Sequence, residues 1–296
     1  RVAYARPRSR PPALMHWDLP RRRVPLDRPF LLGIVNVTPD SFSDGGLFFG
    51  PLAAVDHAER LLDEGADAVD IGGESTRPHN PGAVDEDEEY RRVVPVVAEL
   101  CRRRPEAIIS VDTVKSAVAR GAIDAGADVV NDVSGFRLDA RMAETCAAAR
   151  AGVILMHSRG AVADMATYAH ATYDGDPTDA VVRELGAALD GAVAAGVEAA
   201  RIVLDPGLGF AKRSEDSLAV LRALDRVAAL GRPLLVGASR KRFVGELSGV
   251  AEPSERLHGS VGAHVAALAR GARLFRVHDV RAHRQALDVA WAVLHG

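Results

Sequence analysis

A short apolar run followed by an amphipathic helical segment recurs eight times along this chain of 296 residues. Runs this short and apolar are typical of strands that are buried on both faces of a parallel sheet. Alternating strands and helices predict parallel strands joined by right-handed crossovers. Eight such units predict an α/β fold, the closed (β/α)8 TIM barrel, although the alternation is also compatible with an open doubly wound sheet. The apolar runs are residues 31–35, 68–71, 108–111, 129–131, 153–156, 202–204, 234–236 and 274–277.

The segments between the runs carry helix signals of their own. Residues 216–230, for example, place leucine and valine side chains on one helical stripe. Gly65, Gly126 and Gly271 each open a Gly-Ala-Asp or Gly-Ala-Arg sequence that leads directly into a strand. Glycine is favoured there because the residue that ends a helix commonly has a left-handed backbone. Pro253 predicts the start of the helix that ends before Gly271.

The first 29 residues differ in composition from the rest of the chain, so we assign the barrel to residues 30–296. Eight arginines and six prolines fall within the first 30 residues. No apolar segment of the kind found in a signal peptide is present there. We expect a leader with one short hairpin around residues 14–26, and an arm that binds polyanions is the alternative.

Charge, hydropathy and cysteine content argue against several classes of protein. The formal net charge is −3, whereas a nucleic-acid-binding domain is usually basic. No apolar run reaches the roughly 18 residues of a membrane-spanning helix. Cys101 and Cys146 do not form a CxxC pair, which suits a reducing cytoplasm. We therefore expect a cytoplasmic protein that binds small molecules and neither nucleic acid nor a membrane.

Polar residues follow each of the eight apolar runs, at the strand ends where this barrel carries its active sites. Capping of a helix explains a single aspartate such as Asp132 or Asp279. It does not explain amide, guanidinium, ammonium and imidazole groups distributed over the strand ends. Converging polar groups in a barrel mouth predict a ligand site. The candidates include Asn36, Glu74, Thr76, Arg77, Asp112, Asn131, His157, Asp205, Ser239, Arg240, Lys241, Arg276 and His278.

Cationic residues follow the last two runs, where this fold commonly binds phosphate. Arg276 and His278 alternate along a strand and therefore lie on one face of it. Arg240 and Lys241 follow the preceding run, and Arg77 could add a further cation. Guanidinium groups bind phosphate through paired, charge-assisted hydrogen bonds. For Arg240, a charge that faces solvent is an equally simple interpretation.

Asp112 and Asp205 end the third and sixth runs and are expected to lie across the barrel mouth. Their carboxylates suit a ring that carries N–H donors, while Asn131 and Lys241 can supply donors to its acceptors. These residues alone do not distinguish a pterin from other purine-like rings. His157 has no zinc-type partner in the sequence, and Ser239 with His278 does not establish a nucleophilic triad.

Eight sequence blocks resemble, in order, those of bacterial dihydropteroate synthase. Residues 32–46 and 70–78 form the two long and specific blocks. Together the blocks extend the resemblance over about residues 30–294. The shorter blocks are residues 110–113, 131–135, 155–157, 205–210, 239–241 and 276–279.

The resemblance implies that 6-hydroxymethyl-7,8-dihydropterin pyrophosphate is condensed with p-aminobenzoate to 7,8-dihydropteroate and pyrophosphate. It also implies Mg²⁺ held by Asn36, a homodimer and membership of an enzyme family that is the target of sulfonamides. The catalytic residues would be Asp44, Asp112 and Lys241. The pterin would bind to Thr76, Asp112, Asn131, Asp205 and Lys241, the pyrophosphate to Asn36, Arg77, Arg276 and His278, and the p-aminobenzoate to Phe42, Pro78, Phe210 and Ser239.

Charge then favours a dissociative reaction. Pyrophosphate leaves readily once Mg²⁺ and arginine neutralise it. Departure leaves a cation on the exocyclic methylene of the pterin, which Asp44 and Asp112 would stabilise. The aryl amine then attacks without a strong general base.

Several positions depart from the family pattern, and two other functions remain alternatives. Leu208, Ala211 and residues 79–82 differ from the usual residues, which leaves sulfonamide sensitivity open. Residues 158–177 have no functional interpretation. A pterin-dependent methyltransferase that serves a corrinoid protein would not need the pyrophosphate residues. A non-catalytic pterin-binding paralogue would be expected to have lost some of them.

Overall fold

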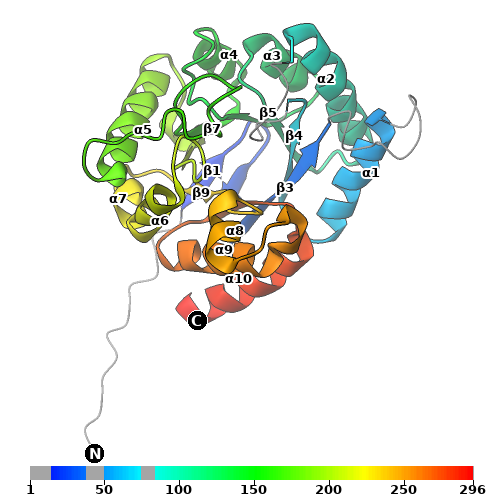
Figure 1. Cartoon of the computed structure of the whole chain (residues 1–296). Helices are drawn as coiled ribbons and strands as arrows, with labels where there is room; N and C mark the ends of the chain where they lie inside the picture. Colours follow the sequence, from blue (N-terminus) through cyan, green and yellow to red (C-terminus); the bar gives the residue numbers. More distant parts are fainter. Residues whose placement is uncertain (1–14, 38–49, 75–83, 296) are drawn as a thin grey trace, which may run out of the picture.

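A computed structural model describes residues 15–37, 50–74 and 84–295 of the chain. Within these residues, eight parallel strands form one sheet in the order β8-β7-β6-β5-β4-β3-β10-β9, with helices arranged around them (Figure 1). The prediction of a (β/α)8 TIM barrel is confirmed. The strands are β3 (Phe30–Asn36), β4 (Ala68–Gly72), β5 (Ile108–Asp112), β6 (Val129–Asp132), β7 (Gly152–Met156), β8 (Ile202–Asp205), β9 (Leu235–Val236) and β10 (Leu274–Val277).

The sheet closes on itself between β8 and β9. Leu204 forms a parallel bridge with Leu234, and its backbone N–H donates to the Pro233 carbonyl at 2.9 Å. On the other side β10 pairs with β3, Leu274 opposite Phe30. The ring of backbone hydrogen bonds leaves the strands without an open edge. All eight carboxyl ends therefore point to one mouth.

The helices follow the expected alternation, with two local differences. The predicted helix over residues 216–230 is broken at Ala223 into α6 and α7, because Ala223 has a non-helical ψ of 30°. Pro253 begins a separate 3-10 turn, η3. The helical elements are α1 (Gly50–Asp63), α2 (Glu86–Arg103), α3 (Ser116–Asp124), α4 (Met142–Ala149), α5 (Pro177–Ala194), η2 (Ala199–Arg201), α6 (Ser214–Arg222), α7 (Leu224–Ala228), α8 (Arg242–Ser248), η3 (Pro253–Glu255), α9 (Leu257–Ala269) and α10 (Val280–His295).

Three helices end at the glycines that the sequence singled out. Gly65, Gly126 and Gly271 have φ values of 103°, 113° and 100°. A side chain rarely adopts this backbone, which explains the glycine before each following strand. No helix in residues 15–37, 50–74 and 84–295 is long and apolar enough to cross a membrane.

A hairpin that precedes the barrel packs against the amino ends of the strands. Its strands β1 (His16–Asp18) and β2 (Arg23–Pro25) are antiparallel, with Trp17 opposite Val24. Trp17 is fully buried, and its indole N–H donates to the Arg201 carbonyl at 2.8 Å. One buried cluster joins the hairpin to inward-facing side chains of all eight strands. The hairpin therefore closes the end of the barrel opposite the mouth.

Replacing Trp17 by alanine should destabilise the whole barrel. Truncation of a buried aromatic side chain costs about 3–5 kcal/mol in the free energy of unfolding, and here a buried carbonyl also loses its donor. Urea unfolding followed by circular dichroism measures the change. Trp291→Ala on α10, where the ring is only half-buried, is the matched control and should cost much less. Equal losses for the two variants would contradict this role of the hairpin.

Candidate functional site

Polar side chains gather at the carboxyl ends of neighbouring strands. Strand register places Asn36 beside Gly72, Gly72 beside Asp112, and Asp112 beside Asn131. Three of the predicted site residues therefore occupy one level of the barrel rim. Asp205 ends β8 on the other side of the mouth. The strands are parallel and in register, so residues far apart in the chain meet there.

Arg276 on β10 binds two carboxylates on neighbouring strands. Its Nε donates to Asp70 Oδ2 at 2.6 Å, and its Nη2 donates to Asp112 Oδ2 at 2.7 Å. Asp70 is fully buried and also accepts from Asn131 Nδ2 at 2.9 Å and from Ser110 Oγ at 2.6 Å. Buried carboxylates require such pairing because desolvation of a charge is costly.

Asp70 is not among the site residues predicted from the sequence. It stands inside an otherwise apolar run, residues 68–71. A carboxylate in the middle of a strand that is buried on both faces requires a partner, and that was the available signal. Asp70 lies one level deeper in the barrel than Asp112 and fixes Asn131 and Arg276 from below.

Burial shifts the pKa values of three side chains in the mouth towards 7, because it disfavours the charged form of each. Desolvation raises the pKa of Asp112 to about 7 against the opposing effect of Arg276. Desolvation likewise raises the pKa of Asp205 to about 6, while a hydrogen bond from the Gly207 N–H opposes the rise. Desolvation and the nearby Arg276 lower the pKa of Lys241 to about 7. Perturbed groups that cluster in this way are typical of binding and catalytic sites.

Lys241 precedes α8 and extends over an aromatic ring. Its Nζ lies 3.7 Å from the centroid of the Phe210 ring, within the range of a cation–π interaction. Electrostatic interaction with Asp205, Asp112 and Arg276 perturbs its pKa. The ammonium, the two carboxylates and the guanidinium therefore belong to one site.

Residues after β9 and β10 form a second part of the mouth. Ser239 Oγ and His278 Nδ1 lie 2.9 Å apart, and the His278 N–H donates to the same hydroxyl oxygen at 3.2 Å. Arg240 has a positive φ of 60° and binds Asp279 through Nη2 at 2.6 Å and Nε at 3.1 Å. The guanidinium of Arg240 is thus held by a carboxylate.

The other polar residues at strand ends have structural partners. Asp132 Oδ1 accepts from the N–H and Oγ of Ser134, at 2.7 and 2.6 Å. These bonds stabilise a turn and not a helix start, because the next helix, α4, begins at Met142. His157 contacts Lys212 and Glu184. Five predicted site residues lie outside the described residues: Phe42, Asp44, Thr76, Arg77 and Pro78.

The residues at the rim are compatible with a magnesium ion that is shared with a phosphate substrate. The described residues contain no group of three or more His, Cys, Asp or Glu that could hold a metal by themselves. Mg²⁺ that bridges substrate phosphates commonly needs only one or two protein ligands besides water. Asn36, at the end of β3 and beside Gly72, offers an amide oxygen at the rim.

Comparison with known proteins assigns this barrel to a class. The profile of the family described as pterin binding enzymes matches residues 32–278. The chain therefore belongs to the pterin-binding enzyme family.

Relatives over almost the whole chain are dihydropteroate synthases. The enzyme of Neisseria meningitidis serogroup B is 42% identical over 94% of this chain and 97% of its own. The enzyme of Mycobacterium leprae is 44% identical over 90% of this chain and 93% of its own. A structure of the Xanthomonas albilineans enzyme with 4-aminobenzoic acid has a TM-score of 0.88 at 45% identity, covering 95% of this chain and 98% of that one. The same enzyme has been solved in complex with 7,8-dihydropteroate, with a TM-score of 0.84 at 44% identity, covering 94% and 98% of the two chains.

The raised pKa of Asp205 predicts a pH-dependent difference between the protein and its Asp205→Asn variant. The carboxyl has a pKa of about 6 when folded and 3.8 as its ordinary value. A raised pKa stabilises the fold below pH 3.8, and this contribution is lost as the pH rises through 6. Between pH 5 and pH 7.5, the unsubstituted protein should lose roughly 1–2 kcal/mol relative to Asp205→Asn.

Urea unfolding at the two pH values measures this difference. Asp190→Asn, which replaces an exposed carboxylate on α5, is the control for the substitution itself. A constant difference between the Asp205→Asn variant and the unsubstituted protein would contradict the burial argument.

Proposed function

We infer that the chain is a dihydropteroate synthase, a transferase that joins a dihydropterin pyrophosphate to p-aminobenzoate with release of pyrophosphate. The observation that carries this inference is the cluster of Asp112, Asn131, Asp205 and Lys241 in the mouth of the barrel, in a chain whose relatives are dihydropteroate synthases. A pterin ring has an edge of N–H donors beside a carbonyl acceptor. Carboxylate, amide and ammonium groups complement that edge.

We propose that the pterin ring lies deepest, between Asp112 and Asp205. Thr76 and Asn131 would contact the same ring, and Lys241 would bind its acceptor side. The Arg276 guanidinium uses two of its five N–H donors on Asp70 and Asp112. These hydrogen bonds would hold the Asp112 carboxylate beside the ring, and the charge of Arg276 opposes the rise in the pKa of Asp112 that burial causes.

The pyrophosphate would bind at the rim, above the pterin. Arg276, His278 and Arg77 would supply cationic or polar donors, and Asn36 would hold Mg²⁺ on the pyrophosphate. When bound, Mg²⁺ would neutralise phosphate charge and make pyrophosphate a better leaving group. The p-aminobenzoate would then lie against Phe42, Pro78, Phe210 and Ser239. Sulfonamides would compete for the same place.

The substitution would proceed by cleavage before bond formation. The bond between the exocyclic methylene and the pyrophosphate oxygen breaks, and its electron pair leaves with the pyrophosphate. The methylene cation is delocalised into the pterin, where the carboxylates of Asp112 and Asp44 stabilise it. The aryl amine nitrogen then attacks the methylene and loses a proton to water.

We also propose that the chain acts in the cytoplasm as a homodimer. Val289 and Val293, one helical turn apart on α10, are 67% and 80% exposed. Exposed apolar side chains that share a helix face favour contact with another protein surface.

Pyrophosphate release tests the activity. The purified protein should release pyrophosphate from dihydropterin pyrophosphate and p-aminobenzoate only with Mg²⁺, matched by dihydropteroate formation. Lys241→Met should lower kcat/KM at least about a hundredfold, because it removes a charged donor in the site. Arg222→Met, an exposed substitution on α6, is the control and should retain activity.

Two negative outcomes would identify the alternatives. Pterin binding without pyrophosphate release would indicate a non-catalytic binding protein. Methyl transfer from methyltetrahydrofolate to a corrinoid protein, without pyrophosphate release, would indicate the methyltransferase.

Asp44 should act in the reaction more than in binding. We expect Asp44→Asn to lower kcat at least about tenfold while the Kd of the pterin substrate changes less than about threefold, since the carboxylate stabilises a cation that forms only during reaction. Single-turnover kinetics and calorimetric titration measure the two quantities. Equal losses in both would assign Asp44 to binding.

A further inference from the structure

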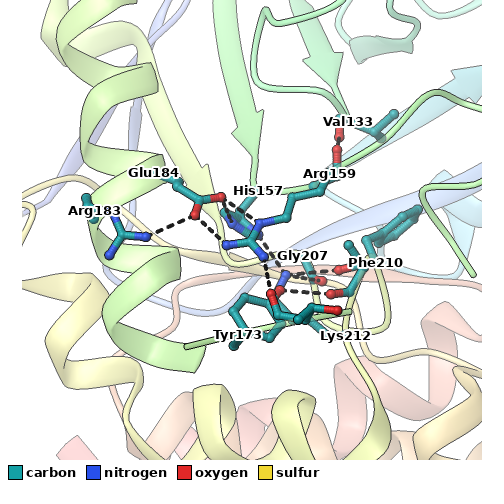
Figure 2. A network of polar contacts seen from close by, with 12 residues as sticks. Val133, His157, Arg159, Tyr173, Arg183, Glu184, Gly207, Phe210 and Lys212 are labelled. Atoms are coloured by element: carbon teal, nitrogen blue, oxygen red, sulfur yellow. Dashed lines mark hydrogen bonds and ion pairs between the residues drawn. The ribbon is translucent and has the colours of Figure 1, made fainter. Parts of the chain in front are cut away.

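Lys212, which follows the β8 loop, is among the largest fully buried side chains of the described residues, with 1% exposure. Its Nζ lies 2.8 Å from His157 Nδ1, 3.1 Å from the Gly207 carbonyl and 3.1 Å from the Phe210 carbonyl (Figure 2). An ammonium group has three N–H donors, and each has one of these acceptors. A neutral amine has only two N–H donors and would leave one of these three acceptors without a hydrogen bond.

The two carbonyls belong to the loop that carries Asp205 and Phe210 to the mouth. The Gly207 N–H donates to Asp205 Oδ1 at 2.7 Å, so the position of Gly207 fixes the carboxylate. Gly207 has a positive φ of 66°, and a side chain there would lie 2.0 Å from the His157 carbonyl oxygen. Lys212 therefore holds a tightly curled loop from behind, while Phe210 contacts Lys241 in front.

Burial lowers the pKa of Lys212 to about 7, and the nearby carboxylates of Asp205 and Glu184 oppose this shift. His157 links the Lys212 ammonium to Glu184. Burial and Lys212 lower the pKa of His157 to about 4, so the ring is neutral near pH 7. Because His157 Nδ1 accepts from Lys212, its Nε2 carries the proton and donates to Glu184 Oε2 at 3.0 Å. The hydrogen bond from His157, together with Arg159, keeps the pKa of Glu184 below its ordinary value. The ammonium and the carboxylate are thus paired through one neutral ring.

The same network fixes residues 158–177, for which the sequence suggested no role. Arg159 Nε donates to Glu184 Oε2 at 2.9 Å, and its guanidinium lies 4.3 Å from the centre of the Tyr173 ring. Tyr173 Oη donates to the Ala211 carbonyl at 2.8 Å. Ala211 itself has a positive φ of 46°, a backbone that alanine rarely adopts without support from its surroundings. The segment therefore packs over the back of the β8 loop.

Composition gives a second, independent reason to single out Lys212. The chain has three lysines and 34 arginines. The other two lysines are Lys241 in the mouth and Lys115, which binds Glu74 at 2.7 Å and also Glu89. Almost every other cationic side chain is arginine, but position 212, where three acceptors surround one nitrogen atom, has a lysine. A compact ammonium fits that geometry and a planar guanidinium does not.

We propose that Lys212 is a positioning residue of the substrate site: paired with Glu184 through His157, it holds the Gly207 and Phe210 carbonyls so that Asp205 and Phe210 face the substrates. The proposal rests on the function inferred above. Lys212 is buried behind the loop and its three donors are used on His157, Gly207 and Phe210, so its effect should fall on substrate binding and only weakly on the chemical step.

Lys212→Met, which keeps the length and removes the donors, tests the role in the full-length protein. The KM of p-aminobenzoate and the Kd of the dihydropterin pyrophosphate should each rise about tenfold or more, while kcat falls less than about threefold. Arg213→Met is the matched control, because Arg213 is the next residue and is exposed. It should leave all three constants within about twofold. Urea unfolding of each variant measures stability separately.

The outcomes separate positioning from stability alone. A folded Lys212→Met enzyme with unchanged KM and Kd, whatever its loss of stability, would overturn the proposal. If that variant does not fold, Glu184→Gln decides, since it keeps the shape and removes the balancing charge. A rise of about threefold or more in the pterin Kd would support the role, and a smaller change would overturn it. Absence of pterin binding in the unsubstituted protein would instead refute the proposed function, and the role of Lys212 with it.

Discussion

The mouth of this barrel is organised by one half-buried guanidinium between two carboxylates. Arg276 from β10 binds Asp70 from β4 and Asp112 from β5, and Asn131 from β6 binds the same Asp70. Removal of the cation would leave the fully buried Asp70 and the partly buried Asp112 without this partner, a cost of several kcal/mol. Because the guanidinium is present, carboxylates can be placed where a ring with N–H donors can reach them. The proposed recognition of the ligand and the cohesion of the strand ends would then depend on the same contacts.

The two ends of the barrel differ in chemistry: the amino ends are apolar and the carboxyl ends carry ionisable groups. At the amino ends, the hairpin and the inward-facing side chains form a dry cluster around Trp17. At the carboxyl ends, the interior contains ionisable groups whose pKa values are shifted by burial. Desolvated charges destabilise a fold, and apolar burial stabilises it. Because these groups lie at opposite ends of the barrel, the apolar burial at the amino ends can offset the free-energy cost of the desolvated charges at the carboxyl ends.

Much of this architecture could be predicted from local sequence. Eight apolar runs gave the strands, and the glycines at positions 65, 126 and 271 marked helix ends with positive φ. Residues that end strands, such as Asp112 and Asn131, were brought together as expected because parallel strands in register share one rim. These features depend on periodicity and on neighbouring residues, which a sequence displays directly.

The features that sequence analysis missed depend on contacts between distant residues. Trp17 donates to the carbonyl of Arg201, 184 positions away, and Arg276 reaches Asp70 across 206. Lys212 resembles an ordinary residue near a helix start until the fold brings His157 against it. The break at Ala223, where ψ is 30°, interrupts a helical stripe that continues in the sequence. The roles of Phe42, Asp44, Thr76, Arg77 and Pro78 stay predictions, because these residues lie outside the described part of the chain.

The hairpin that closes the amino end of the barrel also has a consequence for the order in which substrates bind and products leave. With the amino end closed, a ligand reaches the level of Asp70 and Asp112 from the rim alone. The molecule that binds deepest must then arrive first and depart last. With the pterin deepest and the pyrophosphate at the rim, as proposed above, the pterin compound would precede the aryl amine, and the pyrophosphate would leave before the product. The order of binding and release would thus follow from which end of the barrel is closed.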